Sequence, residues 1–203
     1  RSGPLRLPSN TTLRVERGAT LTFIPRFSLY TPVLTRWEGE ECYGMHPCIF
    51  VSEASNVVIE GSGVIDGSGK PWWEELRRRR VSGETYPKRP EELELASLNG
   101  ETTAANSGGG GRELQFLRPP LIQFFRARHS EVRGVTCQNT PFWNTHIVYS
   151  DEVDIDSVTF RSPDDSPNTD GLNIDSSSDV RIRGCHFDVG DDCIGLKSGS
   201  GPD

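Results

Sequence analysis

Three short stretches decide the fold, and they read SEVRGVTC at 130–137, VDIDSVTF at 153–160 and VRIRGCHF at 180–187. In each, apolar and polar residues alternate on both sides of a Gly or Ser. Alternation with a period of two is typical of a strand with one buried face. A small residue between two such segments indicates a sharp corner. Each stretch therefore predicts two short strands joined by a corner.

The spacing of these stretches indicates how they are stacked. Val132, Ile155 and Ile182 occupy the same place in the pattern and are separated by 23 and 27 residues. Such a repeat is too short for a strand–helix–strand unit at every step, but it suits one coil of a parallel β-solenoid. An antiparallel sandwich, the alternative, needs hairpin turns every 8–12 residues. We therefore expect an all-β parallel β-helix.

The flanking sequence extends this pattern and interrupts it once. Strand-like alternation also occurs at 13–23 and 57–65, and a less regular region lies between them. Residues 70–117 break the pattern, with helix-like composition at 72–80 and 90–98 and a Gly-rich loop after them. We predict one β-helix domain over 1–203, with an irregular, partly helical insertion at 70–117. The chain ends directly after a strand-like segment, so we expect this domain to be incomplete.

The composition excludes several classes of protein. The hydrophobic share of 33 %, with 21 Gly and 14 Pro, argues against a helical bundle. The net charge of −7 gives no sign of nucleic-acid binding. No apolar run approaches the roughly 20 residues of a membrane span. Of the five cysteines, Cys137, Cys185 and Cys193 fall at apolar strand positions, and we expect buried free thiols there.

Two acidic clusters stand one repeat apart. They read NTDG at 168–171 and GDDCIGLKSG at 190–199, so Asp170 precedes Asp191 and Asp192 by 21 and 22 residues. On neighbouring coils, these carboxylates would share one face, as the acid and base of a glycoside hydrolase do. Asp191 and Asp192 can serve the same face only if a turn breaks the strand alternation, and Gly190 favours such a turn. Their proximity should raise at least one pKa. Either cluster alone would also fit a turn or a calcium site.

These motifs resemble those of glycoside hydrolase family 28, the polygalacturonase family. Supporting stretches are GSGVIDGSG at 61–69, RPPLI at 118–122 and NTPFWNTH at 139–146. The resemblance implies a right-handed parallel β-helix that hydrolyses α-1,4-galacturonosyl linkages of pectin with inversion. Asp191 is similar to the family's general acid, and Asp170 and Asp192 match the carboxylates that hold and deprotonate water. The mechanism implied requires no metal and no cofactor.

The candidate substrate contacts are Lys197, Asn168, His146 and Trp143. A structural role fits His146 equally well, and core packing is the simpler interpretation of Trp143. The family's Gly-His-Gly and Arg-x-Lys motifs, whose basic residues contact the substrate carboxylate, do not occur in these 203 residues. We expect a pectic polysaccharide or oligogalacturonide as the partner, a monomer, and a secreted or periplasmic location.

Three other functions remain open at this point. A rhamnogalacturonan hydrolase and a calcium-dependent polysaccharide lyase would use the same fold, and a non-catalytic β-helix could bind carbohydrate. The sequence also leaves open whether cleavage occurs at chain ends or within the polymer.

Overall fold

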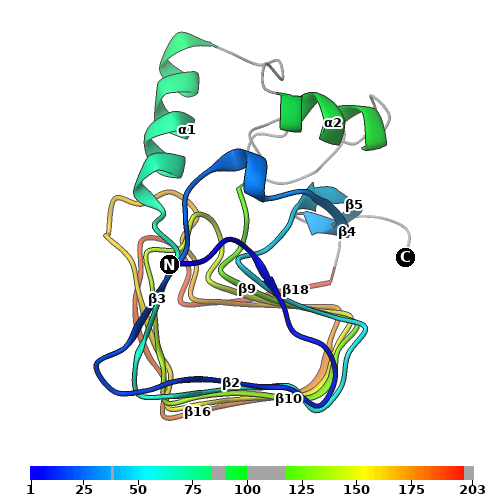
Figure 1. Cartoon of the computed structure of the whole chain (residues 1–203), viewed down its shortest axis with the longest axis vertical. Helices are drawn as coiled ribbons and strands as arrows, with labels where there is room; N and C mark the ends of the chain where they lie inside the picture. Colours follow the sequence, from blue (N-terminus) through cyan, green and yellow to red (C-terminus); the bar gives the residue numbers. More distant parts are fainter. Residues whose placement is uncertain (38, 84–89, 100–117, 199–203) are drawn as a thin grey trace.

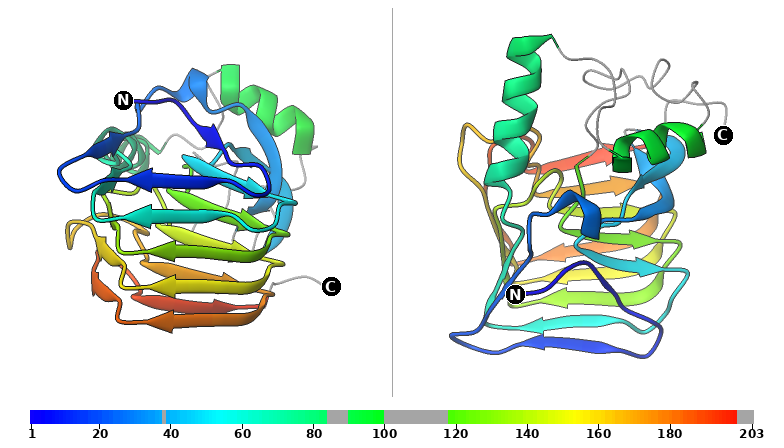
Figure 2. Two further views of the ribbon diagram at one scale, coloured as in Figure 1. Left: turned by 60° about the horizontal axis from the view of Figure 1, so that its bottom comes forward. Right: turned by 45° about the horizontal axis from the view of Figure 1, so that its top comes forward.

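The computed structural model describes residues 1–37, 39–83, 90–99 and 118–198. Most of its strands form three parallel sheets that stack coil upon coil, as Figures 1 and 2 show. The predicted parallel β-helix is therefore confirmed, and the antiparallel sandwich is excluded. Each complete coil contributes one strand to every sheet, with a corner between successive strands.

The bounds of the strands follow the order of the sheets. The six-stranded sheet contains β1 (Leu5–Arg6), β6 (Ile49–Ser52), β9 (Ile122–Phe125), β12 (Thr145–Val148), β15 (Leu172–Asp175) and β18 (Ile194–Lys197). The second sheet contains β2 (Thr12–Val15), β7 (Val58–Gly61), β10 (Arg128–Arg133), β13 (Asp151–Asp156) and β16 (Ser178–Arg183). The third contains β3 (Thr20–Thr22), β8 (Val64–Asp66), β11 (Thr136–Gln138), β14 (Thr159–Arg161) and β17 (His186–Asp188).

The register of the second sheet matches the repeat found in the sequence. Val132 pairs with Ile155, and Ile155 pairs with Ile182. The same ladder continues to Ile59 and Leu13 in the earlier coils. These apolar side chains lie in one column and pack into the core that fills the stack. The 23- and 27-residue steps are therefore single coils.

The predicted corners have the backbone conformation that a sharp change of direction requires. Gly134, Ser157 and Gly184 have φ angles of 72°, 56° and 58°, in the left-handed region. Glycine adopts this region without steric cost, which suits Gly134 and Gly184, whereas Ser157 adopts it despite its Cβ atom. The corner of the coil that contains β7 is at Gly61, with φ of 126°.

Replacing Gly61 with alanine is expected to destabilise the fold by about 3 kcal/mol or more. A Cβ atom at this position would lie 2.0 Å from the carbonyl oxygen of Val15, in backbone that has little freedom to move. Gly18→Ala is the matched control, because its φ is also positive (82°) while no atom lies within 4 Å of the added Cβ. It should cost only about 1–2 kcal/mol. Urea unfolding of both variants measures the difference, and equal losses would contradict the predicted clash.

The interior is apolar, and the final coil is less enclosed than the others. In the interior, Phe160 of β14 and Phe187 of β17 stack with 4.8 Å between their ring centroids. Of the three strand cysteines, Cys137 is buried and Cys185 is half-buried. Cys193 is exposed, so the prediction of a buried thiol there is wrong. It lies in the bend before β18, where no strand of a following coil pairs within the described residues.

The region between 24 and 54 is more regular than the sequence indicated. After a short 3-10 helix, η1 (Phe27–Leu29), strands β4 (Pro32–Trp37) and β5 (Glu40–Met45) form an antiparallel hairpin. Strand β6 then joins the main stack. The hairpin does not belong to the coils, so its sequence does not follow their repeat.

The predicted insertion contains two helices, α1 (Lys70–Ser82) and α2 (Pro90–Asn99). Both stand outside the stack of coils (Figure 1). The Nε1 of Trp73 donates to the carbonyl oxygen of Thr140 at 3.0 Å, which ties α1 to the corner before β12. The Gly-rich loop expected after α2 lies outside the described residues. Within the described part of the chain, neither helix is long and apolar enough to cross a membrane.

Candidate functional site

The candidate acids lie at one corner of neighbouring coils, where the chain enters the six-stranded sheet. Asp170 precedes β15, and Asp191 and Asp192 precede β18. The backbone N–H of Gly171 donates to the carbonyl oxygen of Asp192 at 2.9 Å, and that of Asn144 donates to the carbonyl oxygen of Asp170 at 2.8 Å. Three successive coils are therefore joined at this corner. Both acidic clusters lie side by side, as their spacing predicted.

Asp170 is the buried carboxylate of the group. Its residue is 4 % exposed, and its Oδ2 accepts a hydrogen bond from the Nδ2 of Asn173 at 3.0 Å. Burial is the main cause that raises the pKa of Asp170 to about 6, and the negative charge of Asp191 contributes to this rise. The hydrogen bond from Asn173 and the positive charge of Lys197 lower that pKa but do not offset burial. This carboxyl group can therefore exchange a proton in mildly acidic solution.

Asp191 and Asp192 occupy a bend and are exposed to solvent. The backbone N–H of Asp192 donates to Asp191 Oδ1 at 3.0 Å. Gly190 allows this arrangement, because a Cβ there would lie 2.5 Å from the carbonyl oxygens of Pro163 and Ser166. The predicted break in strand alternation is therefore present. The prediction of a raised pKa rested on the like charges of Asp191 and Asp192, whereas the raised pKa is that of Asp170 and its main cause is burial.

The side chain of Lys197 reaches from the end of β18 towards Trp143, which precedes β12 at this corner. The side chain of Lys197 projects from β18, and its Nζ lies 4.6 Å from the ring centroid of Trp143. Trp143 is 5 % exposed, because its ring packs against Phe142 and His146. The cation and the indole ring hold each other through a cation–π contact that spans two coils. A role in substrate binding stays a prediction for both residues.

Asn168 and His146 contact protein groups in this structure. Asn168 Oδ1 accepts from the guanidinium of Arg118 at 2.6 Å. His146 is 1 % exposed, and its Nδ1 lies 2.9 Å from Gln123 Nε2. Burial lowers the pKa of His146, although the nearby carboxylate of Asp175 raises it in part. These contacts favour a structural role, and substrate binding by either residue stays a prediction.

Two residues that support the site were not singled out in the sequence. Arg118 is buried and donates to the carbonyl oxygens of Pro141 (3.0 Å) and Pro167 (2.7 Å), so it joins the corners of two coils. Asn173 orients the carboxylate of Asp170. Asn173 could have been found from the alternation of apolar and polar residues in LNID at 172–175, because this alternation directs the polar side chains away from the core.

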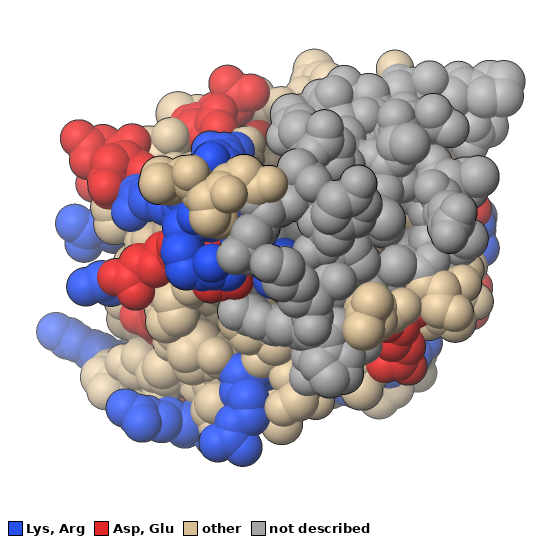
Figure 3. Space-filling model, turned by 90° about the horizontal axis from the view of Figure 1, so that it is seen from above, with Lys and Arg blue, Asp and Glu red and all other residues tan. Residues whose placement is uncertain are grey.

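The surface seen from above in Figure 3 has mixed charge on its described part. Lys and Arg side chains lie next to Asp and Glu on its described part. The net charge of −7 is therefore not concentrated there, and an anionic ligand would not meet a uniformly negative field.

Comparison with known proteins gives several polygalacturonases among the relatives of this chain. A grape (Vitis vinifera) protein described as a probable polygalacturonase is 29 % identical over 98 % of this chain and 35 % of its own. An endo-polygalacturonase of Pectobacterium carotovorum subsp. carotovorum is 26 % identical, over 98 % of this chain and 45 % of its own. The crystal structure of an exopolygalacturonase from Thermotoga maritima matches with a TM-score of 0.77 and 34 % identity, over 97 % of this chain and 44 % of that one.

The chain covers only part of each of these relatives. It spans between about a third and a half of their lengths. The profile of glycosyl hydrolases family 28 matches residues 95–202, just over half of the chain, including both acidic motifs. The stacked sheets agree with the fold of the matched structure. The chain therefore belongs to glycosyl hydrolase family 28.

Proposed function

We propose that the full-length protein hydrolyses α-1,4-galacturonosyl linkages of pectin with inversion at the anomeric carbon. The observation that carries this proposal is the position of Asp170 beside Asp191 and Asp192 at one corner of adjacent coils. Inverting hydrolases need an acid and a base separated by about 6.5–9.5 Å, which leaves room for a water molecule. Strands of adjacent coils lie ~4.8 Å apart, so side-chain reach supplies the remaining distance.

In this mechanism, Asp191 protonates the oxygen of the departing sugar. Asp170 and Asp192 hold the water and accept its proton as it attacks the anomeric carbon. The burial of Asp170 suits a base, because its raised pKa makes the ionised carboxylate a stronger proton acceptor. Asn173 fixes the orientation of that carboxylate.

A substrate with one carboxylate per sugar also requires positive charge near the acids. Lys197 supplies it, because Nζ lies at the same corner and acts on the charge of Asp170. Trp143 holds this ammonium group at 4.6 Å. We further propose that the protein is secreted or periplasmic, since a polymer of the plant cell wall is met outside the cytoplasm.

The function is tested by assaying the full-length protein on polygalacturonate and on rhamnogalacturonan. We expect reducing sugar from polygalacturonate, with an α-linked substrate giving the β-anomer, and an unchanged rate in the presence of a chelator. Faster release from rhamnogalacturonan would assign the activity to that backbone instead. A product that absorbs in the ultraviolet, together with loss of activity on chelation, would indicate a calcium-dependent lyase. Sugar binding without turnover would indicate a non-catalytic β-helix.

A further inference from the structure

The hairpin β4–β5 covers one part of the outer face of the six-stranded sheet. Side chains of this sheet alternate between the core and the outer face. The outer ones are nevertheless buried over three coils, at Phe50, Gln123, Phe125, His146 and Val148. Three of them form an apolar cluster separate from the main core, and Val33 of the hairpin packs against it. Helix α2 packs against the other side of the hairpin.

A closed series of polar contacts fixes the hairpin to the sheet. The hydroxyl of Thr35 donates to Gln123 Oε1 at 2.6 Å, so Gln123 Nε2 is the donor that faces His146 Nδ1 at 2.9 Å. His146 must then hold its proton on Nε2, which lies 3.5 Å from Asp175 Oδ2. The other oxygen of Asp175 lies 3.4 Å from the guanidinium of Arg36. The series therefore begins and ends on neighbouring residues of β4.

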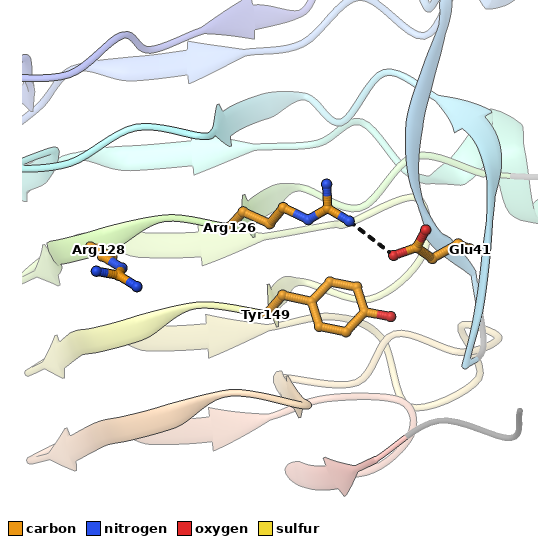
Figure 4. Close-up of a pocket in the computed structure, with 4 residues that line it drawn as sticks. All are labelled: Glu41, Arg126, Arg128 and Tyr149. Carbon is orange, nitrogen blue, oxygen red and sulfur yellow. Dashed lines mark hydrogen bonds and ion pairs between the residues drawn. The ribbon is translucent and has the colours of Figure 1, made fainter. Parts of the chain in front are cut away.

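A second set of contacts holds the hairpin at the C-terminal ends of the strands of this sheet. Glu41 of β5 accepts from the guanidinium of Arg126 at 3.1 Å (Figure 4). The guanidinium of Arg36 lies 4.9 Å from the ring centroid of Tyr149, which directly follows β12. The hairpin is therefore held both over the middle of the sheet and at the ends of its strands, and we interpret it as a fixed element.

The tip of the hairpin reaches the corner that carries the acids. Trp37 stacks on Phe142 at 4.2 Å between centroids, with 16° between the ring planes. Phe142 precedes β12, one coil before Asp170 and two coils before Asp191. A groove that follows the acids from coil to coil therefore meets the Trp37–Phe142 stack immediately beyond Asp170.

We propose that the β4–β5 hairpin is the wall that ends the sugar-binding groove, so that the enzyme holds its polymer by a chain end. Coils lie ~4.8 Å apart, so roughly one or two sugars fit between the wall and the acids. The specificity-determining residues are Trp37 at the tip, and Arg36 and Asp175, which hold the tip in place. This inference rests on the proposed function and names the mode of cleavage at the same site.

The test compares viscosity loss with reducing-sugar release on polygalacturonate, using the full-length protein. We expect the wild type to release one- or two-sugar products while the viscosity stays close to its starting value. Trp37→Ala removes the stack without leaving an unpaired charge, and we expect at least a threefold larger viscosity loss per bond cleaved. Leu34→Ala is the matched control, because its side chain is on the same strand but 42 % exposed. It should keep the wild-type ratio.

The outcomes are distinguishable. A wild type that lowers viscosity as soon as bonds are cleaved would overturn the wall and leave the hydrolase assignment standing. A Trp37→Ala variant with the wild-type product pattern would do the same, once thermal unfolding has confirmed that the variant is folded. Absence of any hydrolysis of polygalacturonate by the wild type would overturn the proposed function itself, and the wall with it.

Discussion

Asp191→Asn is expected to lower kcat on polygalacturonate by about 10²- to 10⁴-fold, the usual contribution of a general acid. Asparagine keeps the size and the acceptor oxygen that binds the N–H of Asp192, but it has no proton of comparable acidity to give to the leaving sugar. Initial rates on polygalacturonate measure the effect. A loss of less than tenfold would contradict the assignment of Asp191 as the acid.

This substitution should leave the fold nearly unaffected. A loss of rate can then be attributed to the lost proton donor and not to unfolding. Asp191 is exposed and lies in a bend, so the free energy of unfolding should change by about 0.5 kcal/mol or less. Asp188→Asn is the matched control, because Asp188 is another exposed carboxylate of the same coil, within 4.0 Å of Arg161. It should retain nearly the full rate. A comparable loss in the control would indicate a general effect of charge.

Asp170→Asn is expected to remove activity and, at neutral pH, to stabilise the protein. The pKa of Asp170 is raised from 3.8 to about 6, so the folded state favours the protonated carboxyl. The contribution of this group to stability is therefore lost as the pH rises from about 4 to about 6. Asparagine does not titrate and avoids that loss. At pH 7, the variant should be more stable than the wild type by about 1–3 kcal/mol, whereas at pH 4 the two should be similar.

Urea unfolding at both pH values measures this difference. If the variant and the wild type differ in free energy of unfolding by the same amount at pH 4 and pH 7, ionisation of Asp170 is not the cause of that difference. The activity should fall by about 10²-fold or more, because the base is lost. A residue whose removal stabilises a protein and abolishes its activity is typical of a functional site.

The pH dependence of the wild-type enzyme decides the role of Asp170. A base must be ionised, so kcat/KM should fall as the pH is lowered through about 6. A fall in kcat/KM as the pH is raised through the same value would instead identify Asp170 as the proton donor. Whether kcat/KM rises or falls with pH near 6 therefore tests the assignment of Asp170 as the base, which the sequence motifs imply.

Much of the fold could be predicted from the sequence because the repeat is local. Each coil needs alternating apolar residues and a small corner residue, and both are visible within eight residues, as at 153–160. The antiparallel hairpin at 32–45 could not be predicted in this way. Its position depends on contacts with residues up to about 140 positions away, such as that between Arg36 and Ser176.

The sequence by itself indicated the coils and predicted that the three acids lie at one corner, because residues separated by about the length of one repeat fall on neighbouring coils. It could not determine which acid is buried. That was decided by tertiary packing, which encloses Asp170 and leaves Asp191 in solvent, and burial is what raises a carboxyl pKa. The tertiary structure also decided what His146 contacts. The sequence left a sugar contact and a structural role equally open, whereas in the structure a hairpin from another part of the chain covers His146, and its Nε2 lies 3.5 Å from Asp175 Oδ2.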